Sequence, residues 1–336
     1  MFHDGKDVVF GAIFRGSLPI VGKARTLDIK SQTENIVYWY NDSRDLNYPT
    51  KEEFQKMIDN HLSINYNLSL PALKGIYSLW PHALKKDSLT EFQNNWLLQT
   101  SMKNIWTLAL DPEYVYSRVF KEYDVFPEII GTCGGIYFVE KVETYDFPYV
   151  IKQLNFDAWV ERVKIALKIL DLIEEFDNMF DYPAHLCDVK MDHFGKSENG
   201  RMKYLDSDNV YLKPIADKSV GDGSYCDKHS DCDLFDCQGY CDPHDNKCRG
   251  GVINNNLQIV CDRIFLGDNF GLRHYGSSGL LVSKHASMKL QQIVDHCSNP
   301  TGSNSDRRLS AGEDVLEQLK SSLKEIIAIH NKLQNE

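Results

Sequence analysis

Two aspartates near the middle of the chain, Asp188 and Asp206, have the sequence context that phosphoryl transfer requires. Asp188 closes the segment His185-Leu186-Cys187-Asp188, and Asp206 follows 18 residues later. Phosphoryl transfer needs a carboxylate near the acceptor hydroxyl, a carboxylate that holds magnesium, a second metal ligand, and a lysine on the phosphates. Asp188 is therefore the candidate for the base-like carboxylate, and Asp206 for the metal ligand.

The elements expected around these aspartates are those that position the two aspartates of a protein kinase. Apolar residues at helical spacing predict a helix over residues 156–180. Asn199-Gly200 predicts the turn of a hairpin over residues 194–205, with Asp206 leaving its second strand. Each aspartate alone reads equally well as a cap or turn residue. Their order on these elements favours a kinase-like fold.

The pattern departs from that of kinases at two places. His193 stands five residues after Asp188, where kinases carry a metal-binding asparagine, and imidazole nitrogen suits magnesium poorly. Ser207-Asp208 follows Asp206 in place of Phe-Gly. Lys190 lies where many kinases place a lysine near the transferred phosphate. We take Asp188 and Lys190 as candidate catalytic residues and Asp206 and His193 as candidate metal ligands.

Nine cysteines indicate covalent cross-links, because six of them crowd into one turn-rich segment with few large apolar residues. The six are Cys226, Cys232, Cys237, Cys241, Cys248 and Cys261. We predict three disulfides among them, in a connectivity that the sequence does not fix. Zinc is the alternative, although no C-x2-C pair is present. Calcium on the many aspartates is a third, although no D-x-D-x-D-G loop occurs. The odd total predicts at least one free or externally paired thiol.

Composition bounds the class of protein. The chain has 336 residues, of which 42% are hydrophobic and 25% charged, enough for two domains or one bilobal domain. A net charge of −11 argues against a nucleic-acid-binding surface. There is no apolar run long enough to span a membrane, and residues 1–6 lack the apolar core of a signal peptide. The sequons Asn41-Asp42-Ser43 and Asn67-Leu68-Ser69 fit a secreted glycoprotein.

The remaining pattern is α+β. Residues 50–110 are expected to be largely helical, with Thr50 as N-cap and acidic residues in the first turn. An amphipathic helix is expected near the end, over residues 315–333. Strands are expected over residues 8–16, 20–24, 36–40 and 131–142. A β-rich part thus precedes a mostly helical part, joined near residues 144–155. This predicts a bilobal arrangement.

Four segments carry a family resemblance. They are Gly131-Thr132-Cys133-Gly134-Gly135-Ile136-Tyr137, Cys187-Asp188 with His193-Phe194-Gly195, Tyr204-Leu205-Asp206, and residues 226–261. Together they resemble the divergent protein-kinase-domain family 1, cysteine-rich kinase-like proteins of the endoplasmic reticulum that include the pancreatitis-induced member. The resemblance covers residues 8 to about 335 and is most specific over 131–261.

The resemblance implies a kinase-like N-lobe over residues 1–148 and a C-lobe over 149–336. The cysteine-rich segment 226–261 would replace the activation segment. It further implies the lumen of the endoplasmic reticulum, and ATP with magnesium or manganese. Lys23 looks like the strand lysine that contacts ATP, and Lys30 is the second candidate. Either lysine could instead be an ordinary surface residue. The family also carries a type II anchor and an N-terminal cysteine-rich segment, so we expect this chain to be truncated or unusual.

Two family features look lost. The EF-hand-like insert of the N-lobe would fall around residues 80–91, where Asp87 and Glu91 remain without the alternating acidic ligands. We therefore predict no calcium site. The glutamate that pairs with the kinase lysine is not identifiable, and Lys103 stands near its expected place, which puts the ion pair in doubt.

Three functions follow as hypotheses. The first is a pseudokinase or weakly active nucleotide-binding domain of the secretory pathway, acting as a binding or scaffolding module for an unknown luminal protein. The alternative is an active luminal protein kinase that uses Asp188 and Asp206. The third is a cytosolic zinc protein built on the cysteines.

Overall fold

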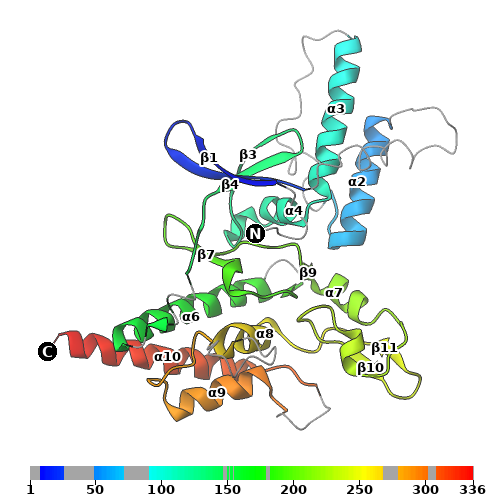
Figure 1. Ribbon diagram of the computed structural model, residues 1–336. Coiled ribbons are helices and arrows are strands. Elements are labelled where there is room, and N and C mark those ends of the chain that lie inside the picture. The colour runs from blue at the N-terminus through cyan, green and yellow to red at the C-terminus, as the bar shows by residue number, and fades with distance from the viewer. Residues whose placement is uncertain are drawn as a thin grey trace. The chain divides into compact units, whose positions relative to one another are not determined.

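The computed structural model confirms the predicted mixture of helices and strands (Figure 1). The residues that it describes are 8–25, 49–71, 91–146, 150, 152–153, 155–178, 182–267, 279–301 and 308–335. They form two compact units. The first comprises Met1–Val142 with Asp206–Asp208, and the second comprises Glu143–Leu205 with Asn209–Glu336. The strand expected at 36–40 and the lysine at position 30 lie outside the described residues.

The first unit contains a four-stranded antiparallel sheet in the order β1-β2-β4-β3. Its strands are β1 (Val8–Phe14), β2 (Leu18–Ala24), β3 (Ile129–Cys133) and β4 (Ile136–Glu140). Figure 1 shows the β1–β2 hairpin in dark blue. The single strand expected over 131–142 is in fact a hairpin, because Gly134 adopts a φ of 62° that turns the chain back.

Helices and a 3-10 turn accompany this sheet in the described residues of the first unit. They are α2 (Lys51–Tyr66), α3 (Glu91–Ala109), α4 (Pro112–Val119) and η2 (Lys121–Tyr123). The predicted cap of α2 is confirmed as a capping box, in which the Glu53 amide donates to Thr50 Oγ1 and the Thr50 amide donates to Glu53 Oε2. Asn67, the sequon residue, is exposed at the C-cap of α2.

The described part of the second unit is mostly helical and contains small sheets ordered β5-β7-β8, β6-β9 and β10-β11. Its strands are β5 (Glu143–Thr144), β6 (Ala184–Leu186), β7 (Phe194–Lys196), β8 (Met202–Tyr204), β9 (Val210–Leu212), β10 (Tyr240–Asp242) and β11 (Lys247–Arg249). Its helices are α6 (Phe156–Asp177), α7 (Lys213–Val220), α8 (Asn256–Val260), α9 (Met288–Ser298) and α10 (Glu313–Gln334), with shorter turns η3 (Met191–His193), η4 (His229–Cys232) and η5 (Cys261–Leu266).

The long helix expected before the first aspartate is confirmed as α6, which begins after the N-cap Asn155. Figure 1 shows α6 in green beside the red α10, and the two helices pack together. The Asn-Gly hairpin is confirmed as β7–β8, with Gly200 at a φ of 85°. Among the described residues, every helix is too short or too polar to cross a bilayer.

A buried arginine anchors the loop before α9. Arg162, 2% exposed on α6, donates from Nε to the Leu280 carbonyl at 2.8 Å. Its Nη2 donates to the carbonyls of Gly279 at 2.9 Å and Val282 at 2.6 Å. Burial lowers the pKa of Arg162. The side chain thus satisfies three carbonyls that have left regular secondary structure.

We expect Arg162→Met to lower the free energy of unfolding by about 3–5 kcal/mol, because it strands buried carbonyls without donors. Urea denaturation measures this change. Lys164→Met on the same helix is the control, since Lys164 is exposed and pairs only across one turn with Glu161. Its effect should stay below about 1 kcal/mol. Equal losses in both variants would contradict the anchoring role.

All six cysteines of the crowded segment form disulfides, but only four of them pair among themselves. The bonds are Cys226–Cys241, Cys232–Cys248, Cys187–Cys237 and Cys261–Cys297. The prediction of three bonds confined to the six is therefore wrong. It failed because residues 237 and 261 fold back onto β6 and α9. Cys133, at the end of β3, is a free and exposed thiol, as the odd count requires.

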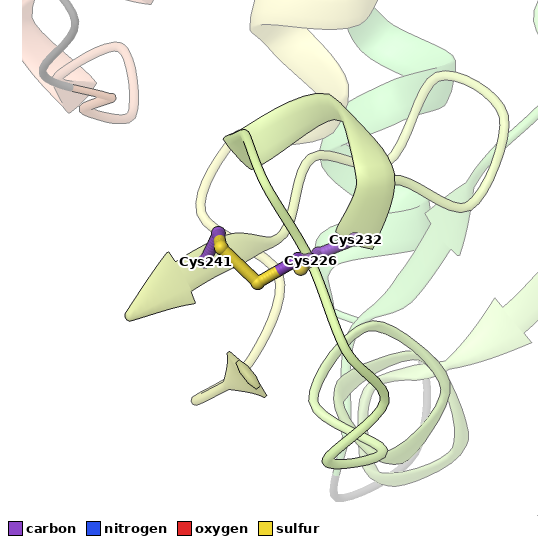
Figure 2. Close-up of side chains that lie close together, drawn as sticks. All are labelled: Cys226, Cys232 and Cys241. Carbon is purple, nitrogen blue, oxygen red and sulfur yellow. A yellow bond between two sulfur atoms is a disulfide. The ribbon is translucent and has the colours of Figure 1, made fainter. Parts of the chain in front are cut away.

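The two internal bonds lie side by side. Figure 2 shows the Cys226–Cys241 bond with Cys232 next to it, and the sulfur atoms of these three residues lie within 4.8 Å of one another. Such proximity also suits a metal, but these sulfurs are oxidised in pairs and carry no thiolate for zinc. The choice of disulfides over zinc is confirmed for these four cysteines, although the number of bonds within the segment is two and not three.

Candidate functional site

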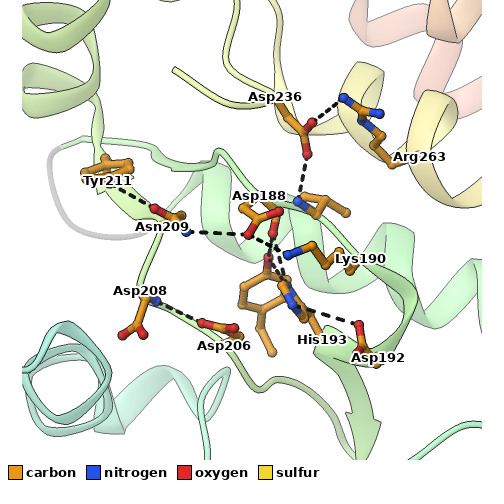
Figure 3. A network of polar contacts seen from close by, with 12 residues as sticks. Asp188, Lys190, Asp192, His193, Asp206, Asp208, Asn209, Tyr211, Asp236 and Arg263 are labelled. Carbon is orange, nitrogen blue, oxygen red and sulfur yellow. Dashed lines mark hydrogen bonds and ion pairs between the residues drawn. The ribbon is translucent and has the colours of Figure 1, made fainter. Parts of the chain in front are cut away.

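Asp188 lies in the loop between β6 and η3, and its carboxylate has two side-chain neighbours (Figure 3). Lys190 Nζ donates to Asp188 Oδ2 at 2.9 Å, and Asn209 Nδ2 lies 3.5 Å from the same oxygen. The structure therefore brings the two predicted catalytic residues together. Asn209, just before β9, was not anticipated from the sequence. Its amide oxygen accepts a hydrogen bond from Tyr211 at 3.1 Å, which orients its Nδ2 group toward Asp188.

His193 supports the backbone of this loop. The ring is buried, and its Nδ1 lies 3.0 Å from the Asp188 carbonyl oxygen and 3.3 Å from the Tyr204 hydroxyl. The Tyr204 hydroxyl donates to the same carbonyl at 2.9 Å. The side chains of His193 and Tyr204 thus fix the position of the Asp188 carbonyl group. This geometry favours a positioning role for His193, and its role as a metal ligand stays a prediction.

A second brace reaches the Asp188 loop from the cysteine-rich segment. Cys187, the residue before Asp188, is bonded to Cys237. Asp236 donates its amide to the Cys187 carbonyl at 2.7 Å and accepts the Val189 amide on Oδ2 at 2.8 Å. Arg263 holds the other oxygen of Asp236 at 2.6 Å, as Figure 3 shows. The residues on either side of Asp188 are therefore fixed by one covalent bond and two hydrogen bonds.

His185 lies in β6, just before this loop, and is buried. Among the described residues, neither ring nitrogen has a hydrogen-bond partner. Burial, with a smaller contribution from Lys213, lowers the pKa of His185 to about 4, while Asp217 acts in the opposite direction. The folded protein therefore holds this imidazole neutral.

This depressed pKa predicts a pH-dependent stability. The unfolded chain protonates His185 near its ordinary pKa of 6.5, but the folded chain does so only near 4. The neutral, buried His185 therefore contributes fully to the free energy of unfolding above pH 6.5. As the pH falls from 6.5 toward 4, the folded protein loses up to about 3 kcal/mol of this stability. His185→Leu has no such loss. Its free energy of unfolding, compared with that of wild type, should therefore rise steadily as the pH is lowered from 6.5 to 4.

Urea unfolding at pH 7, 5.5 and 4.5 measures the difference. His296→Leu, at an exposed site on α9, serves as the control and should follow wild type. A constant difference between His185→Leu and wild type across the three pH values would refute the neutral, buried state of His185.

The first unit carries an ion pair that the sequence did not reveal. Lys23 on β2 pairs through Nζ with Glu113 Oε1, and their side chains are only 15% and 4% exposed. Glu113 lies in the first turn of α4, after the N-cap Asp111 and Pro112. The expectation that Lys103 replaces the partner glutamate is therefore corrected. The acid lies on the short helix α4, whose start is marked by Asp111-Pro112-Glu113.

Tyr137 lies beside this pair. It is opposite Lys23 in the β2–β4 register, and its hydroxyl lies 3.4 Å from Asp111 Oδ1. Burial raises the pKa of Tyr137 well above 10, and the charges of Glu113, Asp111 and Asp208 raise it further. Tyr137 thus stays protonated, with carboxylates gathered around it.

Asp206 belongs to the first unit, although Leu205 before it and the chain from Asn209 onward belong to the second. The segment Asp206–Asp208 groups with Met1–Val142, and the Asp208 amide donates to Asp206 Oδ1 at 3.2 Å. On the other side of that boundary, the Leu205 amide donates to the His193 carbonyl at 2.8 Å. The predicted metal ligand therefore shares a unit with the Lys23–Glu113 pair.

Asp206 and Asp208 offer the type of donor that a hard divalent cation takes. Carboxylate oxygens of Asp206 and Asp208 are the ligands that magnesium and manganese prefer. The imidazole of His193 fits less well, because its Nδ1 is directed at a carbonyl and a hydroxyl of its own unit. Residues 80–90, where the calcium loop was considered, lie outside the described residues.

The chain was compared with solved structures and with models of protein families. A solved structure of the Rv3197–erythromycin complex from Mycobacterium tuberculosis matches 61% of this chain at 13% identity, with a TM-score of 0.29. This chain covers 43% of that one, and a likeness so weak carries no argument. A family model described as the protein-kinase domain of FAM69 matches residues 105–300, which is more than half of the chain and includes Glu113, Asp188 and Asp206. The chain belongs to this family of divergent protein-kinase domains.

Proposed function

We propose that this protein is a nucleotide-binding, kinase-like domain of the secretory pathway that binds ATP with magnesium or manganese. Lys23 contacts the phosphates, Glu113 orients Lys23, and Asp206 holds the metal. The domain is bilobal, and its stapled segment 226–261 takes the place of a mobile activation segment. Asp188 with Lys190 faces the acceptor hydroxyl.

The observation that carries the proposal is the buried ion pair between Lys23 and Glu113. Taking two charges out of water is costly, and a strand lysine held by a helix glutamate is the arrangement with which protein kinases position the lysine on the ATP phosphates. The missing glutamate was one of three sequence-based reasons to expect a pseudokinase, beside His193 and the missing Phe-Gly. The contact between Lys23 and Glu113 supports the view that Glu113 fills this place.

Four disulfides indicate an oxidising, secretory or luminal environment. The endoplasmic reticulum and N-glycosylation at the exposed Asn67 are parts of this proposal that fit the same compartment. The thermal stability of the oxidised full chain should therefore be studied without reducing agent.

The proposal is tested by thermal unfolding with and without ATP, in magnesium and in manganese. ATP at 100 times its Kd adds about 2.7 kcal/mol to the stability, a shift of several degrees. ATP with EDTA is the control and should give a much smaller shift. The absence of a metal-dependent shift at millimolar ATP would exclude nucleotide binding as the function.

A second candidate is a binding module that holds nucleotide without transferring phosphate. It is favoured by His193, which is turned toward the Asp188 carbonyl and occupies the position of the kinase asparagine. Phosphate transfer from labelled ATP to the chain itself or to a peptide mixture separates the two candidates. Transfer that disappears in Asp188→Asn would establish the enzyme, and binding without transfer would establish the module.

A further inference from the structure

A polar pocket of about 110 Å³ lies in the second unit, between the cysteine-rich segment and η5. Its lining includes Asp233, Phe235, Asp236, Gln258, Asp262 and Arg263. Asp236 is the residue that braces the Asp188 loop, so the pocket shares a wall with the candidate catalytic segment. The site described above makes no use of the space itself.

The pocket has an excess of acceptors over donors. Arg263 pairs with Asp236 at 2.6 Å and lies 3.9 Å from Asp262, and Arg308 binds Asp233 through both nitrogens. The three aspartates of the lining still outnumber these two arginines, so the pocket remains negatively charged. Gln258 is 6% exposed, and its Oε1 has no hydrogen-bond partner among the described residues. A buried amide oxygen left unpaired is costly, so a ligand that brings N–H donors would relieve it.

An exposed aromatic ring lies at the edge of this pocket. Phe235 is 63% exposed and holds a φ of 51°, which a bulky residue rarely adopts. It occupies the tight turn of residues 234–237, whose ends exchange backbone hydrogen bonds at 2.8 and 2.9 Å. An aromatic face beside carboxylates favours an organic cation over a hydrated metal ion.

We propose that this pocket binds the guanidinium or ammonium group of a basic side chain on an acceptor protein. The inference rests on the proposed function, because it assigns the pocket to a segment that docks next to Asp188. Asp262 supplies the negative charge, Gln258 accepts an N–H, and Phe235 covers the cation. The substrate class is then a luminal protein with arginine or lysine near its phosphorylated hydroxyl.

The probe is N-acetyl-arginine methylamide, titrated into the oxidised full chain by NMR, with the neutral citrulline analogue as its isosteric control. We expect a Kd in the millimolar range, about 4 kcal/mol of binding free energy. Citrulline should bind at least about tenfold more weakly, because it loses the charge-assisted hydrogen bonds. Equal binding of both probes, or binding of neither, would overturn the proposal.

Two variants locate the binding. Asp262→Asn should weaken arginine binding about tenfold, because it removes a charge next to the cation. Phe235→Gly should weaken it about threefold, and it should not destabilise the fold because glycine accepts a positive φ. Asn246→Gly, which relaxes another positive φ on the exposed β10–β11 turn, is the matched control and should leave the Kd unchanged. Unchanged binding in both pocket variants would reject the site.

The same samples are tested for the metal-dependent ATP shift. A normal ATP shift without discrimination between arginine and citrulline rejects this inference alone. Arginine binding without any ATP shift supports the pocket and overturns its assignment to a phosphoryl acceptor. Retention of the ATP shift in Asp262→Asn and Phe235→Gly, together with weaker arginine binding, confirms both.

Discussion

Replacement of Lys23 by methionine should abolish the metal-dependent stabilisation by ATP and also lower the free energy of unfolding by about 3 kcal/mol. Both effects have the same cause, since Glu113 is 4% exposed and would lose the cation that compensates its burial. Removing one partner of a buried pair typically costs about 3–5 kcal/mol. The first effect is read from thermal shifts with ATP and manganese, and the second from urea denaturation.

A double variant separates structure from function. Lys23→Met with Glu113→Gln removes the stranded charge, so most of the lost stability should return while the ATP shift stays absent. Lys121→Met breaks an exposed pair with Glu128 in the same unit. It should leave the ATP shift unchanged and should lower the free energy of unfolding by no more than about 1 kcal/mol. Recovery of the ATP shift in the double variant would remove Lys23 from the nucleotide site.

Loss of the bond between Cys187 and Cys237 should have the next largest effect. The double replacement of both cysteines by alanine opens a connection across 50 residues, which corresponds to about 4 kcal/mol in the chain-entropy account. It also frees the turn that carries Asp236 from the Asp188 loop. Amide hydrogen exchange should therefore rise strongly over residues 185–193, where the brace is made.

The control is the double alanine replacement of Cys226 and Cys241, which are 15 residues apart. It should cost about 3 kcal/mol, but without faster exchange over residues 185–193, because this bond lies within the segment itself. Similar protection of that loop in both double variants would contradict its bracing by the cysteine-rich segment.

Much of the helical framework was predictable from local pattern. The helix at 156–177 and the hairpin at 194–204 follow from apolar spacing and an Asn-Gly turn, which are short-range signals. The hairpin at Gly134 was missed because two short strands and their turn read as one β-rich run. The pairing of Asp188 with Lys190 was also accessible, since the two residues are neighbours in the chain.

The long-range contacts were not predictable in this way. Glu113 lies 90 residues from Lys23, and no local pattern connects them. Cys187 and Cys297 lie outside the crowded segment, so cysteine counting confined the bonds to the wrong set. The side chains of Asp236 and Tyr204 contact backbone groups of the Asp188 loop, and every residue type carries such groups, so no sequence pattern marks these contacts.

The metal dependence of nucleotide affinity tests the central claim most directly. Calorimetric titration of ATP with manganese into the oxidised wild-type chain should give a Kd at or below the millimolar range. Asp206→Asn should weaken binding by at least about tenfold, because an amide replaces the carboxylate that holds the cation. Wild-type affinity in Asp206→Asn, or no binding heat in the wild type, would contradict the account.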